Sequence, residues 1–161
     1  YLTGIQYLNF LADIYHISAS EREESIAAYT DVLKLSDALG DLISSYSHGM
    51  KQKLALAGAL LHKPRLLILD EPFVGLDPQA IITLKAIMHR LCQEGAAVFF
   101  STHVLDVAEK LCNKVAIIMQ GRLVAEGETA ALTGGRTLEE VFMEVVSNAP
   151  SDLAADAHNS L

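Results

Sequence analysis

The sequence predicts an α/β fold in which a helical segment precedes a parallel sheet. Residues 1–63 carry apolar side chains at helical intervals, and two short apolar runs follow at residues 66–69 and 96–100. Such runs are typical of strands buried on both faces of a parallel sheet. The helical pattern between the two runs favours a strand–helix–strand unit.

Within the helical segment, local signals predict where helices begin. Thr3 with Gln6 and Ser20 with Glu23 have the capping-box spacing, which places a helix start at each serine or threonine. A third helix is expected to begin at Ser47 and to end before the next proline.

The segment after the first apolar run continues with further helix and turn signals. Asp77 before Pro78 predicts an N-cap and the first turn of a helix. Residues 115–125 are expected to form a hairpin around a turn at 120–122. A short helix is expected over 104–112, and a last helix should begin after Thr137.

Composition and charge limit the class of protein. The 161 residues carry a formal net charge of −8, and 51% of them are apolar, which suffices for one domain with a core. Negative charge disfavours nucleic acid as a partner. The two cysteines have no metal-ligand spacing, and no apolar run approaches the roughly 20 residues of a membrane span. Because the first residue is Tyr1 rather than Met, we expect the sequence to begin within a longer protein.

Polar side chains follow both apolar runs. Asp70 and Glu71 come directly after the first run, and Ser101, Thr102 and His103 follow the second. Ligands of open parallel sheets bind beyond the carboxyl ends of the strands, so we expect both groups at one crevice. One carboxylate there can hold Mg²⁺, and a second can polarise a water for attack on phosphate. An acidic capping loop and a structural histidine are the alternatives.

Two further segments bear on phosphate binding. Ser47, with Gly49 two positions later, leaves free backbone N–H groups at a helix start. The helix dipole favours an anion there. An ordinary N-cap is the alternative interpretation of this segment. Residues 75–77, taken by themselves, indicate only a turn that leads into the next helix.

The order and spacing of these segments resemble the ABC ATPase family. Residues 47–52 resemble its signature motif, residues 66–71 its Walker B strand, residues 75–77 its D-loop, and His103 its switch histidine. The likeness extends from residue 1 to about residue 146. It implies a partial P-loop NTPase (RecA-like) parallel sheet, with a helical subdomain at the N-terminal side and a small C-terminal β-hairpin.

The resemblance implies that the chain is divided into three parts. These are a helical, signature-bearing subdomain over residues 1–63, a RecA-like α/β portion over residues 64–149, and a disordered tail over residues 150–161.

The resemblance also implies roles in ATP hydrolysis. Asp70 would help to hold Mg²⁺, and Glu71 would be the general base that orients the attacking water. His103 would contact the γ-phosphate of ATP.

Other implied roles involve partners. Ser47 and Gly49 would contact the γ-phosphate of ATP bound mainly to the opposite subunit of a head-to-tail dimer, and Asp77 would communicate between the two sites. The helical segment would face a transmembrane permease from the cytoplasmic side of the membrane. The resemblance thus implies the ATP-hydrolysing subunit of a transporter, and the form of residues 46–53 resembles the signatures of exporters with a separate permease.

The sequence departs from the family pattern in three places. His48 and Met50 stand where the signature usually has Gly and Gln, and Val74 stands where the D-loop commonly has Ser. No GxxxxGK[ST] phosphate loop occurs in the chain, so we expect the chain alone to bind ATP weakly and to hydrolyse it negligibly.

Two other functions stay open at this stage. One is a binding module that supplies only the signature face to ATP held by a partner. The other is a soluble ABC ATPase of repair or translation, a class with long coiled-coil, zinc or basic inserts that this sequence does not have.

Overall fold

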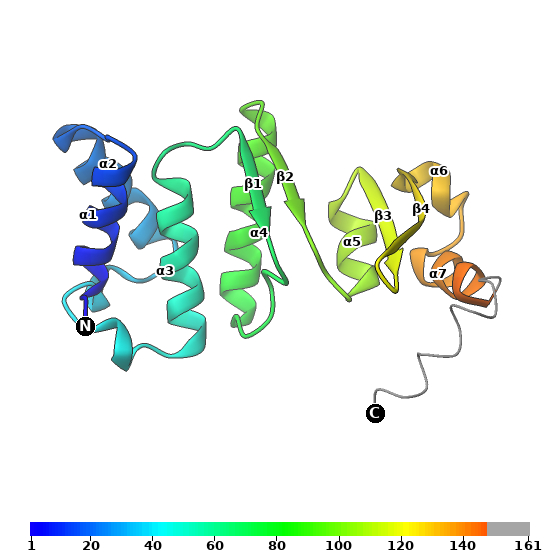
Figure 1. Cartoon of the computed structure of the whole chain (residues 1–161), viewed down its shortest axis with the longest axis horizontal. Coiled ribbons are helices and arrows are strands. Elements are labelled where there is room, and N and C mark those ends of the chain that lie inside the picture. Colours follow the sequence, from blue (N-terminus) through cyan, green and yellow to red (C-terminus); the bar gives the residue numbers. More distant parts are fainter. Residues whose placement is uncertain (148–161) are drawn as a thin grey trace. The chain divides into compact units, whose positions relative to one another are not determined.

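The computed structural model of the chain describes residues 1–147. Its contacts divide the chain into two compact units, Tyr1–Ser101 and Thr102–Leu161, each of which is described by itself. Figure 1 labels the helices and strands in chain order. The domain limits expected at 63/64 and 149/150 stay predictions, and the expected tail at 150–161 lies outside the described residues.

Three helices make up the first part of the first unit. They are α1 (Gly4–Ile14), α2 (Ala19–Val32) and α3 (His48–Leu60), with 3₁₀ turns at Ser36–Ala38 and Ile43–Ser45. Helix α3 packs against both α1 and α2. The side chains between the three helices are buried, among them Leu8, Ala12, Leu54 and Leu60. This apolar core holds α3, and with it the segment that begins at Ser47, in place.

Side-chain caps fix the starts of α1 and α3 where the sequence predicts them. In the capping box of α1, the Thr3 N–H donates to Gln6 Oε1 at 2.9 Å, and the Gln6 N–H donates to Thr3 Oγ1 at 3.3 Å. Ser47 is the N-cap of α3. Both predictions are confirmed because each side chain supplies an acceptor that the first helical turn lacks.

The start predicted for α2 at Ser20 is wrong. The N-cap is Ser18, whose Oγ accepts from the Glu21 N–H and donates to Glu21 Oε2 at 2.6 Å. Both serines have an acid three positions later, so spacing alone could not decide between them. Arg22, in the first turn of α2, forms an ion pair with Asp13 of α1.

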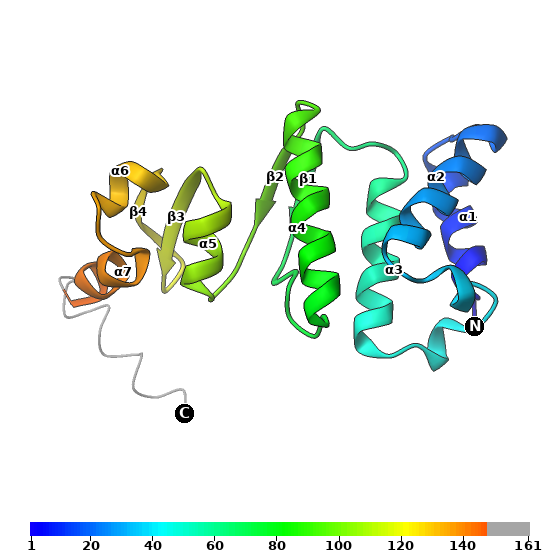
Figure 2. The same cartoon turned by 180° about the vertical axis from the view of Figure 1, so that it is seen from behind.

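The second part of the first unit is the predicted strand–helix–strand unit. Strands β1 (Leu66–Leu69) and β2 (Ala97–Phe100) pair in parallel, and α4 (Pro78–Gln93) connects them. Figures 1 and 2 show α4 alongside the strand pair. Its buried face includes Leu84, Met88 and Leu91. The parallel pairing brings the carboxyl ends of β1 and β2 to one edge.

The expectation that both strands are buried on both faces is wrong. Leu66, Ile68 and Phe99 are 54%, 67% and 59% exposed, whereas Leu67, on the opposite face, is 4% exposed. Side chains alternate between the faces of a strand. Helix α4 covers one face, and within residues 1–147 no third strand pairs with β1 or β2.

The second unit contains α5 (Leu105–Leu111), β3 (Lys114–Met119), β4 (Arg122–Glu128), α6 (Thr129–Thr133) and α7 (Leu138–Ser147). The predicted hairpin is confirmed, since Met119 pairs with Arg122 across a two-residue turn. The turn residues Gln120 and Gly121 both have positive φ, 49° and 73°. Turns of this kind match the twist of paired strands.

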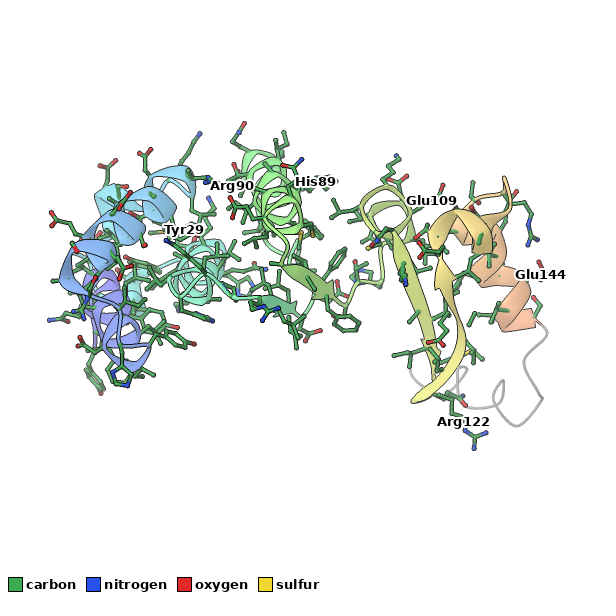
Figure 3. The ribbon with its side chains drawn as sticks, turned by 90° about the horizontal axis from the view of Figure 1, so that it is seen from above. Tyr29, His89, Arg90, Glu109, Arg122 and Glu144 are labelled. Atoms are coloured by element: carbon green, nitrogen blue, oxygen red, sulfur yellow. The ribbon has the colours of Figure 1, made fainter. Side chains whose placement is uncertain are left out.

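The predicted last helix is also confirmed, whereas α6 was not predicted. The Thr137 N–H donates to Glu140 Oε2 at 2.9 Å, and the Glu140 N–H donates to Thr137 Oγ1 at 3.2 Å. Glu109 of α5, labelled in Figure 3, accepts from the Leu138 N–H at 2.6 Å and so joins α5 to the start of α7. Helix α6 has five residues, too few for a periodic pattern, and ends at Gly134 in the left-handed conformation.

Two further features are the state of the cysteines and the character of the helices. Cys92 and Cys112 are free thiols, and burial raises the pKa of the Cys112 thiol. No helix within residues 1–147 combines the length and the apolar character of a membrane span.

Candidate active site

Three polar residues lie together at the carboxyl edge of the strand pair. Asp70 and Glu71 follow β1, and Ser101 follows β2. The Ser101 hydroxyl donates to Asp70 Oδ1 and accepts from the Glu71 N–H at 3.1 Å. The Ser101 N–H donates to the Leu69 carbonyl at 3.0 Å, which extends the ladder by one bond. One hydroxyl therefore holds both candidate acidic residues to the neighbouring strand.

Glu71 has an unusual backbone conformation. Its φ is +43°, in the left-handed region, which costs a residue other than glycine about 1 kcal/mol. The bond from its N–H to Ser101 and a bond from the Val74 N–H to its carbonyl at 3.2 Å hold this conformation. Strain of this kind gathers at functional sites. It turns the chain sharply after β1, with Asp70 exposed and Glu71 half-buried.

The start of α3 is the second part of the candidate site. Ser47 has an extended backbone, and its Oγ accepts from the Met50 N–H at 3.2 Å. Ser47 is exposed and Gly49 is half-buried. A Cβ at Gly49 would lie 2.8 Å from the Gly75 carbonyl oxygen, so only glycine fits there. The open N–H groups of this helix start suit an anion.

The close approach of α3 to residues 75–77 also accounts for His48. Gly75 has a φ of +77°, and a Cβ there would lie 2.7 Å from His48 Cδ2. The imidazole therefore lies over the Cα of Gly75. A histidine fits at a position where the family usually has glycine because residue 75 has no side chain.

Asp77 joins two helices. Its Oδ1 accepts from the Ala80 N–H at 2.9 Å as the N-cap of α4, and its Oδ2 lies 2.9 Å from Lys53 Nζ on α3. The hydrogen bond from Lys53 and then that from the Ala80 N–H lower the pKa of the Asp77 carboxyl. Asp77 is thus held as a carboxylate between α3 and α4.

His103 belongs to the second unit. It lies in the segment that leads into α5 and is exposed, and the neighbouring Thr102 Oγ1 accepts from the Val104 N–H at 3.1 Å. The roles expected for His103 and for the residues of the first unit stay predictions.

Sequence reasoning did not assign a role to Ser101, Gln52 or Lys53. Ser101 could have been found from the register, because the residue after β2 lies beside the residue after β1. Gln52 and Lys53 gave no such signal, since their partners Pro72 and Asp77 lie 20 and 24 positions away in the sequence.

Comparisons with known proteins agree with this arrangement. A family model described as "AAA domain, putative AbiEii toxin, Type IV TA system" matches residues 19–105, more than half of the chain. More than half of the chain therefore matches the AAA domain family. A solved structure described as "Structure of ATP binding subunit of ABC transporter" matches with a TM-score of 0.85 and 34% identity, covering 89% of this chain and 62% of that one.

Two relatives define the family more narrowly. The chain is 40% identical to the ABC transporter ATP-binding protein YdbJ of Bacillus subtilis, over 90% of this chain and 46% of that protein. It is 35% identical to the fluoroquinolones export ATP-binding protein MT2762 of Mycobacterium tuberculosis, over 89% of this chain and 46% of that protein. The chain belongs to the family of ABC transporter ATP-binding proteins, and the predicted fold class is confirmed. It spans about half the length of these relatives.

Proposed function

We propose that this chain is part of the ATP-hydrolysing subunit of an ABC transporter, which couples hydrolysis to transport through a separate permease. The observation that carries the proposal is the pair Asp70 and Glu71, both held by Ser101 at the carboxyl edge of a parallel strand pair. Export is the favoured direction, because one of the relatives is named for fluoroquinolone export.

Glu71 is the general base in this proposal. Its carboxylate follows the strand end in a sharp turn and accepts a proton from the water that attacks the γ-phosphate. The Ser101 hydroxyl acts by fixing the backbone of Glu71, so that the carboxylate keeps one position while water is oriented. His103 contacts the γ-phosphate as a hydrogen-bond donor.

Asp70 is the residue that would hold Mg²⁺. Mg²⁺ at nucleotide sites uses one or two carboxylates together with phosphate oxygens and waters. Asp70 is exposed at the strand end, which fits a cation held chiefly by the nucleotide. When bound, Mg²⁺ would neutralise charge on the phosphates.

The start of α3 contributes to a second site in trans. Ser47 and Gly49 present N–H groups to the γ-phosphate of ATP on the opposite subunit of a head-to-tail dimer. Asp77 lies between α3 and α4 and so communicates between the two sites. The helices of residues 1–63 face the permease, which places the protein at the cytoplasmic face of the membrane as a peripheral subunit.

The chain alone is expected to bind ATP weakly and to hydrolyse it negligibly. It contains no GxxxxGK[ST] segment, and hence no backbone cradle and no lysine for the β- and γ-phosphates. Ordinary ATP turnover by the isolated chain would contradict this part of the proposal.

The test uses a chimeric subunit in which this chain follows the phosphate-loop region of a matched relative. Glu71→Gln in that subunit should lower ATP turnover by roughly a hundredfold or more and leave ATP binding in place, since the amide cannot accept the proton. Glu94→Gln, an exposed acid at the end of α4, is the matched control and should leave turnover unchanged. Unchanged turnover in Glu71→Gln would remove Glu71 from the role of base.

A further inference from the structure

Helix α3 and the loop over residues 72–77 lie in close contact at Gly49 and Gly75. A Cβ at Gly49 would lie 2.8 Å from the Gly75 carbonyl oxygen, and a Cβ at Gly75 would lie 2.7 Å from His48 Cδ2. Contacts this close leave no space for a methyl group on either side. They bring the two segments together, but van der Waals contact alone does not fix their relative position along the helix axis.

Two side chains from the next turn of α3 cross to the same loop. Lys53 Nζ lies 2.9 Å from Asp77 Oδ2, and Gln52 Nε2 donates to the Pro72 carbonyl at 2.9 Å. The Lys53 side chain is 14% exposed, whereas that of Asp77 is 54% exposed. The lysine stem is therefore packed against the protein and its ammonium group has little freedom to leave the carboxylate. These bonds hold the loop at both ends, at residues 72 and 77.

The polar character of Gln52 has an energetic consequence. Its Oε1 is buried and has no hydrogen-bond partner within the described part of the chain. It lines a cavity of about 290 Å³ whose other walls include Leu56, Leu69 and Leu84. A buried amide oxygen without a partner is unfavourable, and an apolar residue of similar size would avoid that loss. The amide is thus better explained by its bond to the loop than by packing.

We infer that Lys53 and Gln52 are positioning residues, which fasten α3 to the loop so that Ser47 and Asp77 move as one body. Neither residue touches nucleotide in this account. Each acts through the loop that begins directly after Glu71 and ends at Asp77. The mechanical link stands on geometry alone, and its consequence for ATP hydrolysis rests on the proposed function.

The link can be measured without nucleotide, by NMR of the 161-residue chain. Lys53→Gln should speed hydrogen exchange of the Val74 and Leu76 amides by about threefold, the factor expected for loss of a partly exposed ion pair. It should also raise the pKa of the Asp77 carboxyl toward its ordinary value, because the bond from Lys53 is the largest cause of its lowering. Lys53→Arg should restore both readings, because the guanidinium keeps the charge and the donors.

Lys51 provides the matched control. It lies on the same helix and is exposed, and Lys51→Gln removes the same charge without touching the loop. The inference is overturned if Lys53→Gln leaves loop exchange and the Asp77 pKa unchanged, or if Lys51→Gln alters them equally. It is also overturned if Gln52→Leu leaves loop exchange unchanged. A chimeric subunit without ATP turnover would instead refute the proposed function and leave these readings intact.

Discussion

At the residue scale, the hydroxyl group of Ser101 determines the geometry of the candidate active site. It belongs to the residue that follows β2, and it contacts both residues that follow β1. It also compensates the left-handed backbone of Glu71 by accepting from the N–H of that residue. Because Asp70 and Glu71 are adjacent, a single hydroxyl can set the position of both.

Removal of this hydroxyl should affect stability and turnover together. Ser101→Ala is expected to cost about 1 kcal/mol in the free energy of unfolding, through loss of its hydrogen bonds. Turnover of the chimeric subunit should fall roughly tenfold or more, since the acidic residues lose their fixed position. Chemical denaturation and an ATPase assay provide the two readings. Ser101→Thr retains a hydroxyl and should lie close to the parent in both; an equal loss in Thr and Ala variants would contradict the role given to the hydroxyl.

Gly75 gives a second residue-scale prediction. Gly75→Ala should lower the free energy of unfolding by about 2 kcal/mol, since φ is +77° and the new Cβ would lie 2.7 Å from His48 Cδ2. In a His48→Gly background the steric part disappears and only the conformational part remains, so the same change should cost less. Equal costs in the two backgrounds, measured by urea denaturation, would show that His48 does not lie over Gly75.

At the element scale, the N-terminus of helix α3 combines a side-chain cap with the phosphate contact that we propose for it. The N-cap at Ser47 satisfies the Met50 N–H, while the remaining N–H groups of the first turn stay open. Those two properties can be separated by the choice of side chain. An aspartate caps a helix as well as serine does, but its charge opposes an approaching phosphate.

Ser47→Asp should therefore keep the free energy of unfolding near that of the parent and abolish ATP turnover. Ser47→Ala should lower the free energy of unfolding more than Ser47→Asp does. The alanine variant is expected to lose about 1 kcal/mol in the free energy of unfolding. Thermal melting should leave the aspartate variant near the parent, and the ATPase assay of the chimeric subunit should find its turnover lost. Normal turnover in Ser47→Asp would rule out phosphate contact by this helix start.

The predictions from sequence agree best with the structure for features that a short stretch of sequence determines. The capping boxes at Thr3 and Thr137, the N-cap at Asp77 and the parallel order of β1 and β2 all follow from local signals. The start of α2 could not be placed, because two serines offered the same spacing to an acid. Contacts between distant segments, such as Lys53 with Asp77, depend on packing that no periodic pattern records.

At the scale of the whole molecule, each unit has an apolar core, but the strand pair of the first unit leaves one face open. Continuous apolar runs predicted cover on both sides, and the helix between the strands covers only one. Leu66, Ile68 and Phe99 form an exposed apolar patch, which favours association between molecules.

Ile68→Thr should reduce self-association without unfolding the chain. Ile68 is 67% exposed, and threonine keeps the β-branched shape that suits a strand. Sedimentation velocity should find more monomer in this variant, with little change in the free energy of unfolding. Leu67→Thr changes the covered face, where the side chain is 4% exposed, and should instead destabilise the chain by roughly 2 kcal/mol or more. Equal association in the parent and Ile68→Thr would show that this patch is not the cause.

The central claim is that Glu71 and Ser47 act on the same ATP from opposite subunits. Mixing chimeric subunits that carry either Glu71→Gln or Ser47→Asp tests it most directly. Each variant alone is expected to be inactive, but a mixed head-to-tail dimer contains one site with both natural residues. Random mixing should therefore restore about one quarter of the parent ATP turnover, because half of the dimers are mixed and each has one working site. Turnover that stays at the level of the separate variants, although mixed dimers form, would contradict the account.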